Sequence, residues 1–235
     1  MKIVIITPFE VHHKYIISEI SKKFKEIYIV NDTKKIKPKF NTNYKNLVLQ
    51  KNYEKKLWFK KNKSLSKRLN KIKIHDVNLK KNIIKIQKLR PNLIITSGAI
   101  KLDKNFLKKF KDIKIINLHG GDPNYYRGLD SLMWAIYHND FKKLKVSMHY
   151  VKEKLDCGDI IDIKKIKIHR NMKFYQLRAE NVENTKKMLL TYLQKIFKNK
   201  KIKIRKNKLG KYYSFMPSIL KDIVERKFNN YTKKL

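Results

Sequence analysis

The chain has 235 residues, 42% of them hydrophobic and 11% aromatic, which suffices for one globular domain with a small appendage. Its net charge of +40 comes from 59 basic and 19 acidic residues, and only seven of the basic residues are arginine. Surfaces that read nucleic acid rely on arginine, so we interpret the evenly spread lysines as a compositional bias rather than as a binding site for RNA or DNA.

The composition also limits the compartment. Cys157 is the only cysteine, so an internal disulfide is excluded and nothing points to an oxidising compartment. The first apolar run is short and is followed at once by polar residues, which is typical of a first strand and not of a signal peptide. No apolar run approaches the ~18 residues of a membrane span. We therefore expect a cytoplasmic protein without a membrane segment.

The first half of the chain alternates between strand-like and helix-like patterns. Continuous β-branched and apolar runs predict strands at residues 2–7, 27–31, 93–96 and 113–118. Apolar residues at helical spacing predict helices at residues 15–24, at 76–89 with Asp76 as the N-cap, and at 104–110 with Asp103 as the N-cap. Residues 32–74 have a weaker pattern, which we interpret as an irregular excursion with one short helix. This order predicts an α/β fold with a Rossmann-like, mostly parallel sheet flanked by helices.

The second half predicts more strands and a mixed extension. We expect a helix at residues 132–137, strands at 145–151 and 160–168, and a polar loop at 152–158 between those strands. Beyond them we expect a long helix at 174–197, a β-hairpin pairing 202–205 with 212–215, and a terminal helix after Pro217. We interpret residues 1–168 as the main domain and residues 169–235 as a small C-terminal α+β extension that carries the β-hairpin.

Residues 115–161 contain four of the six glycines in the chain, which marks a shaped loop. Asn117 and His119 stand at the carboxyl end of a predicted strand, which is where ligands bind in parallel sheets. Asp156 lies in the polar loop that follows a later strand. The turn after the first strand, TPFEVHH, has no glycine, so a dinucleotide cofactor has no cradle there.

An amide, an imidazole and a carboxylate suit the transfer of an acyl or formyl group to an amine. The imidazole can take the proton that the attacking amine loses. The amide can stabilise the negative charge that develops on oxygen, and the carboxylate can hold the histidine or order a water. This chemistry needs neither a metal nor a covalent intermediate. Each residue also has an ordinary explanation, as a strand end, a loop histidine or a turn former, and spacing alone does not separate these alternatives.

A series of short motifs in this region resembles the formyltransferases that use N10-formyltetrahydrofolate. The motifs are Asn117-Leu118-His119, Pro123, Tyr126-Arg127-Gly128, Trp134-Ala135-Ile136, His149, and Leu155-Asp156 with Gly158 and Ile160. The resemblance implies that residues 1–168 form the formyltransferase catalytic domain and that the extension serves dimerisation or substrate binding.

The resemblance also implies roles for individual residues. Asn117 would bind the formyl oxygen, His119 would act as base or oxyanion partner, and Asp156 would tune His119 and relay protons. The pterin of the co-substrate would lie near Gly98, Ile100, Leu102, Lys154 and Leu155, held partly by main chain. The acceptor would contact Asp122, Tyr126 and Arg127, although Arg127 could equally brace the loop.

Departures from the family pattern point to one branch. The sequence HGGDPNYYRGLDS is similar to that of the sugar N-formyltransferases, so we expect a dTDP-linked amino-deoxysugar as acceptor and a homodimer. Glycinamide ribonucleotide and methionyl-tRNA formyltransferases stay open as alternatives. The first has a glycine-rich phosphate loop after the first strand that this chain lacks, and the second appends a tRNA-binding β-barrel for which about seventy residues look too short. A non-catalytic basic RNA-binding relative is the alternative from another class.

Overall fold

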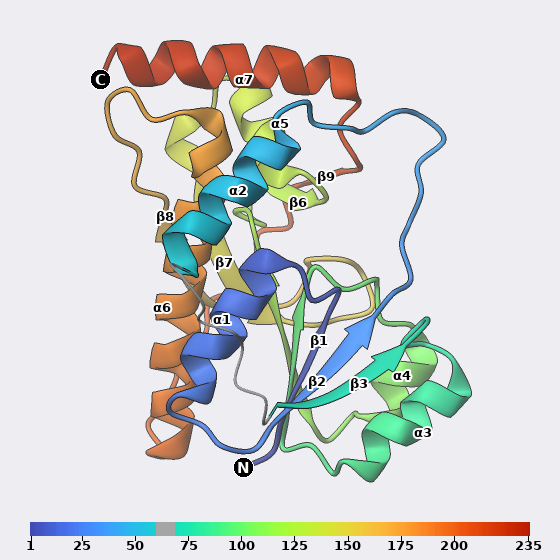
Figure 1. Ribbon diagram of the computed structural model, residues 1–235. Helices are drawn as coiled ribbons and strands as arrows, with labels where there is room; N and C mark the ends of the chain where they lie inside the picture. The colour runs from blue at the N-terminus through green and yellow to red at the C-terminus, as the bar shows by residue number, and fades with distance from the viewer. Residues whose placement is uncertain (60–68) are drawn as a thin grey trace.

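A seven-stranded sheet runs through the residues that the computed structural model describes, 1–59 and 69–235 (Figure 1). Its strand order is β3-β2-β1-β4-β5-β7-β8. The strands are β1 (Ile3–Thr7), β2 (Ile27–Asp32), β3 (Asn70–Ile74), β4 (Leu93–Ser97), β5 (Lys114–His119), β7 (Lys145–Tyr150) and β8 (Ile160–Lys165). The first five strands pair in parallel, whereas β7 and β8 join by antiparallel pairing. The predicted α/β fold with a mostly parallel sheet is confirmed.

Helices cover both faces of the sheet. One face carries α1 (Val11–Ser21), α2 (Leu47–Trp58) and α6 (Leu177–Phe197), and the other carries α3 (Lys80–Lys88) and α4 (Lys104–Lys109) (Figure 1). The helices α5 (Ser131–Tyr137) and α7 (Ser218–Lys233) pack against each other, and the 3₁₀ helices are η1 (Phe141–Lys143) and η2 (Phe174–Gln176). On β1, Ile3 and Ile5 face the first layer while Val4 and Ile6 face the second. Burial on both faces explains why the central strands have no polar alternation.

Residues 32–74 are more ordered than their sequence pattern suggests. They contain α2 and the edge strand β3, while residues 60–68 lie outside the described part of the chain. Most side chains of β3 are exposed, so the strand contains lysine and asparagine and lacks the apolar run by which the other strands were predicted. The prediction that Asp76 caps a helix is wrong, because α3 begins at Lys80 after an N-cap at Leu79. Instead, the Asp32 carboxylate accepts the N–H groups of Asp76 and Val77 and holds this turn in place.

The predicted β-hairpin at 202–215 is also wrong. Strand β9 (Lys211–Tyr213) pairs in parallel with β6 (Tyr126–Gly128), and Arg205 pairs with Ile160 at the edge of β8. Gly210 lies so close to the main chain of Tyr125 that a Cβ there would be 2.3 Å from its atoms. The segment therefore runs along the glycine-containing loop after β5 instead of folding back on itself.

The C-terminal helices share the core of the sheet. Leu189 and Leu193 of α6 are fully buried together with Met148 of β7, and Phe228 of α7 belongs to the same cluster. The division into residues 1–168 and 169–235 stays a prediction, but the two parts are packed on one another.

Candidate functional site

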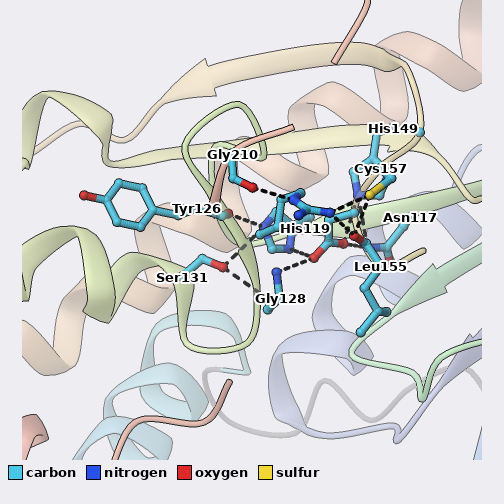
Figure 2. Close-up of polar contacts among 12 residues, drawn as sticks. Asn117, His119, Tyr126, Gly128, Ser131, His149, Leu155, Cys157 and Gly210 are labelled. Atoms are coloured by element: carbon cyan, nitrogen blue, oxygen red, sulfur yellow. Dashed lines mark hydrogen bonds and ion pairs between the residues drawn. The ribbon is translucent and has the colours of Figure 1, made fainter. Parts of the chain in front are cut away.

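The three residues singled out in the sequence meet at the end of β5. Figure 2 shows Asn117 and His119 there, with Leu155 and Cys157 of the loop that carries Asp156 beside them. Asn117 and His119 are two positions apart on one strand, so both point to the same face. Asn117 Nδ2 donates to Asp156 Oδ1 at 3.2 Å, and His119 Nδ1 lies 3.6 Å from Asp156 Oδ2. The Thr96 hydroxyl donates to Asn117 Oδ1 at 2.8 Å and fixes the orientation of the amide. The groups are therefore held in one arrangement.

A fourth residue of the cluster, His149, comes from the neighbouring strand. In the β5–β7 register it lies opposite Asn117, and a pairing irregularity between Met148 and His149 interrupts the ladder with β8. Its Nε2 is 3.2 Å from Asp156 Oδ1, and its Nδ1 lies 2.8 Å from the Tyr150 carbonyl. The sequence motif contained His149 but assigned it no role.

The loop that carries Asp156 is shaped by close packing. Asp156 has a φ of 51°, in the left-handed region, and a Cβ on Gly158 would lie 1.7 Å from the Tyr150 carbonyl oxygen. Asn207 donates to the carbonyls of Asp156 and Gly158 at 2.8 and 3.1 Å. The main-chain N–H of Gly128 donates to Asp156 Oδ2 at 2.7 Å. Segments from three parts of the chain thus place one carboxylate.

The surroundings set the protonation of the cluster. Burial acts to raise the pKa of Asp156, but the nearby His119 and His149 and the Gly128 N–H outweigh it and hold that pKa well below its usual range. Burial lowers the pKa of His119, and His149 adds to the effect while Asp156 opposes it. At neutral pH this combination gives an ionised carboxylate beside a neutral imidazole, which can accept a proton.

Two pockets adjoin this cluster. The larger, of about 350 Å³, is bounded by Asn117, His119 and Asp156 on one side and by residues of α2, α5 and α6 on the other. The smaller, of about 50 Å³, lies between the turn after β4 and the loop before β8. Asn117, Asp156, Ala99 and Leu155 line both pockets. The reactive groups therefore stand where two ligands could meet.

A family model described as "Formyl transferase" matches residues 14–193. The chain belongs to the formyl transferase family. The match covers most of the chain and includes every residue of the cluster contributed by β5, β7 and the loop before β8.

Curated relatives match this formyl transferase over part of their length. Methionyl-tRNA formyltransferase of Finegoldia magna is 31% identical over 93 residues, covering 39% of this chain and 29% of that protein. Phosphoribosylglycinamide formyltransferase of Dictyostelium discoideum is 39% identical over 87 residues, covering 33% of this chain and 41% of that protein. The chain thus matches less than half the length of these relatives.

Solved structures share the fold over almost the whole chain. A protein from Mycobacterium tuberculosis, Rv3404c, described as a likely sugar N-formyltransferase, has a TM-score of 0.62 at 14% identity and covers 91% of this chain and 75% of its own. The formyltransferase PseJ from Anoxybacillus kamchatkensis, solved with UDP-4,6-dideoxy-4-formamido-L-AltNAc and tetrahydrofolate, has a TM-score of 0.56 at 18% identity, covering 91% and 86%. At these identities the likeness concerns the fold.

The residues expected to hold the co-substrate mostly border the pockets of this formyl transferase. Ile100 and Leu102 line the small pocket, Gly98 lines the large one and Leu155 lines both. Lys154 lines neither. The small pocket is walled about equally by apolar and polar residues and borders Asn117, which suits a flat heterocycle with polar edges.

The three residues expected to bind the acceptor do not line either pocket. The Asp122 carboxylate is buried and pairs with Lys145 at 2.8 Å. The Tyr126 hydroxyl donates to Asp140 at 3.1 Å, and only its main-chain carbonyl approaches His119. Arg127 donates to the carbonyls of Gly210 and Leu155 and to Cys157 Sγ, so it braces the loop around Asp156. This is the alternative that the sequence left open for Arg127.

Sequence reasoning missed the residues on the far wall of the large pocket. Gln50 from α2 and Arg178 and Asn181 from α6 face the cluster across it. Gln50 precedes Asn117 by 67 residues, Arg178 and Asn181 follow Ile160 by 18 and 21, and the three form no motif of their own. A polar pair three positions apart on an otherwise apolar helix face is the one signal that could have marked α6.

Within the described residues, no group of three or more histidine, cysteine, aspartate or glutamate side chains could hold a metal ion. The described helices also include none that is long and apolar enough to cross a membrane.

Proposed function

We propose that this protein transfers a formyl group from N10-formyltetrahydrofolate to the amine of a nucleotide-linked amino sugar. The observation that carries the proposal is the position of Asn117 and Asp156 on the wall shared by two pockets, with His119 beside them on the larger pocket, in a member of the formyl transferase family. A two-substrate transfer requires such a junction, because the reacting atoms have to approach to about 3–3.5 Å.

The folate would supply the formyl carbon that the acceptor amine attacks. We assign its pterin to the small pocket, with Ile100 and Leu102 against the ring and the loop around Leu155 as the outer wall. The acceptor then occupies the large pocket in front of His119. Water is kept from the reacting atoms by the burial of His119 and Asp156.

Three residues of the cluster, Asn117, His119 and Asp156, have defined tasks in this proposal. The neutral imidazole of His119 takes the proton that the amine loses as its nitrogen bonds to the formyl carbon. The Asn117 amide donates to the formyl oxygen as negative charge develops there. Asp156 remains ionised and stabilises the His119 imidazolium that forms. The imidazolium then returns its proton, through a water ordered by Asp156, to the folate nitrogen as the bond between that nitrogen and the formyl carbon breaks.

A sugar acceptor is supported by three observations. The HGGD sequence after β5 resembles that of the sugar branch, the turn after β1 lacks a glycine-rich phosphate loop, and the fold matches Rv3404c and PseJ over most of their lengths. That the nucleotide is dTDP, that the chain is a homodimer and that it works in the cytoplasm stay predictions.

The test is a direct transfer assay with saturating N10-formyltetrahydrofolate. Acceptors are a panel of dTDP- and UDP-linked amino sugars, glycinamide ribonucleotide and methionyl-tRNA, since curated relatives act on the last two. Formylation of an amino sugar is the expected result. Transfer only to methionyl-tRNA or glycinamide ribonucleotide would overturn the sugar assignment. The non-catalytic RNA-binding alternative predicts a different result. It would be favoured by the absence of transfer to any acceptor, together with tight tRNA binding whose affinity falls steeply with salt concentration and is unchanged by Asn117→Ala.

A further inference from the structure

The far wall of the large pocket is built mainly by the start of α6. Phe174, Leu177, Arg178 and Asn181 line the pocket at spacings of three and four, which places them on one helical face. Gln50 of α2 completes this wall. The wall combines two apolar side chains with three hydrogen-bonding groups, and it faces the catalytic cluster across the pocket.

The guanidinium of Arg178 is oriented by a buried partner. Its Nε and Nη2 donate to Oε1 and Oε2 of Glu54 at 2.6 and 2.8 Å, and the Glu54 side chain is wholly buried. The Arg178 side chain is 25% exposed, and no acceptor for its Nη1 lies among the described residues. A side-on pair of this kind fixes the plane of the guanidinium and leaves one edge of it for a ligand.

Positive charge dominates this end of the pocket. Burial and, to a smaller extent, the charge of Arg178 together lower the pKa of His13 to about 3. Burial also lowers the pKa of His12, with His13, Arg178 and Lys51 adding to it. Arg178 thus acts as a positive charge on both histidines.

Asn181 lies between this charge and the catalytic histidine. Its Nδ2 is so near Gly120, the residue after His119, that a Cβ there would approach within 2.8 Å. The Thr185 hydroxyl donates to Asn181 Oδ1 at 3.2 Å and turns the amide nitrogen away from the helix. With a rise of 1.5 Å per residue, Arg178 lies about 4.5 Å from Asn181 along the helix axis, toward the N-terminus of α6. An acceptor whose amine sits at His119 thus extends past Asn181 to reach Arg178.

We propose that Arg178, assisted by Gln50 and Asn181, binds the phosphate of the acceptor, so that the pocket selects amines that carry a phosphate. This inference rests on the proposed function and adds the group that recognises the substrate. Arg178 takes the role that a phosphate loop after β1 would otherwise have, since that turn has no glycine.

The test compares wild-type protein with the double variant Arg178→Gln/Glu54→Gln. Removing the arginine alone would leave the buried Glu54 carboxylate unpaired and could unfold the protein, whereas two glutamines can still pair with each other and leave the net charge unchanged. Lys187→Gln, at an exposed position of α6, controls for the general attraction of anions to a basic chain. Melting temperatures of all three proteins are measured first.

Two acceptors separate recognition from chemistry: a dTDP-linked amino sugar and the same amino sugar as a phosphate-free methyl glycoside. The double variant is expected to raise KM for the dTDP-linked acceptor about 10- to 100-fold, with kcat within threefold and KM for the methyl glycoside unchanged. Lys187→Gln should leave KM for both acceptors unchanged. The assignment would be overturned if the double variant raised KM equally for both acceptors, or for neither of them.

The same proteins also test the inference if the proposed function fails. If wild-type protein formylates neither acceptor, binding of dTDP is measured by calorimetry at fixed salt. A loss of tenfold or more in dTDP affinity in the double variant but not in Lys187→Gln supports the phosphate site without the reaction. Equal affinities of the wild-type and double-variant proteins, or no dTDP binding by either, would refute it.

Discussion

The two ends of the large pocket are built in opposite ways. At the β5 end, the Asp156 carboxylate lies within 3.6 Å of polar side-chain atoms of Asn117, His119 and His149. The main-chain N–H of Gly128 fixes this carboxylate further. At the α6 end, Arg178 and Asn181 are each anchored from behind and present nitrogen donors to the pocket. The first arrangement leaves little freedom to adapt, which suits groups that must match a transition state. The second leaves donors for a ligand, which suits recognition.

The largest effect is expected from changing the β5 end. His119→Asn removes the base, and Asp156→Asn removes the charge that stabilises its protonated form. Each should lower kcat by about 10² to 10⁴-fold. Steady-state kinetics measure the loss, and melting curves show whether the fold survives. A variant that folds and keeps a tenth of the wild-type turnover would remove its residue from the proposed mechanism.

A smaller effect is expected from Asn207→Ala, which acts on the same end from a distance. Asn207 is buried and holds the carbonyls on both sides of Cys157, so its loss lets the Asp156 loop relax. We expect kcat to fall by about 10- to 100-fold with little change in acceptor KM, because misplacement by about 1 Å costs on this scale. Asn184→Ala, which removes a side-chain hydrogen bond to Lys165 at an exposed site, is the matched control. Equal effects of the two variants would contradict a positioning role.

The protonation of His119 gives a third way to sharpen the comparison. Burial lowers its pKa below 6.5, so the neutral base persists to a lower pH than for a free imidazole and is lost only as pH falls through that lowered value. NMR titration of the His119 ring, assigned with His119→Asn, measures this directly and avoids the titration of the acceptor amine. A midpoint above 6.5 would show that Asp156 outweighs burial.

The smallest effect on activity is expected from Asp122, which lies outside both ends. Asp122→Asn weakens the pair with Lys145 and should cost about 1–3 kcal/mol of stability. The KM for either substrate should stay within twofold, because Asp122 lines neither pocket. Thermal melting and kinetics measured together test this. A selective rise in acceptor KM at unchanged stability would restore the role predicted from the sequence.

Local patterns were sufficient for much of the fold and for the reactive residues. Strands β1, β2, β4 and β5 are largely buried on both faces, so each contains a run rich in apolar residues. Asn117, His119 and Asp156 occur within 40 residues, in motifs whose order carries the family resemblance. Edge strand β3 escaped detection because solvent covers most of its side chains and its residues are mainly lysine and asparagine.

The recognition residues and the supports of the site were decided by tertiary structure. Gln50, Arg178 and Asn207 reach the pocket or its loop from segments far apart in the chain, and each would be an ordinary polar residue in another fold. The pairing of β9 with β6 likewise depends on the close approach of Gly210 to Tyr125, which no local pattern encodes. Chemical groups and strand periodicity are properties of neighbouring residues, so the sequence alone was enough to predict the parallel sheet and to single out Asn117, His119 and Asp156. Which distant side chains share a pocket depends on how helices and loops pack, so the fold alone brought Arg178 to face His119.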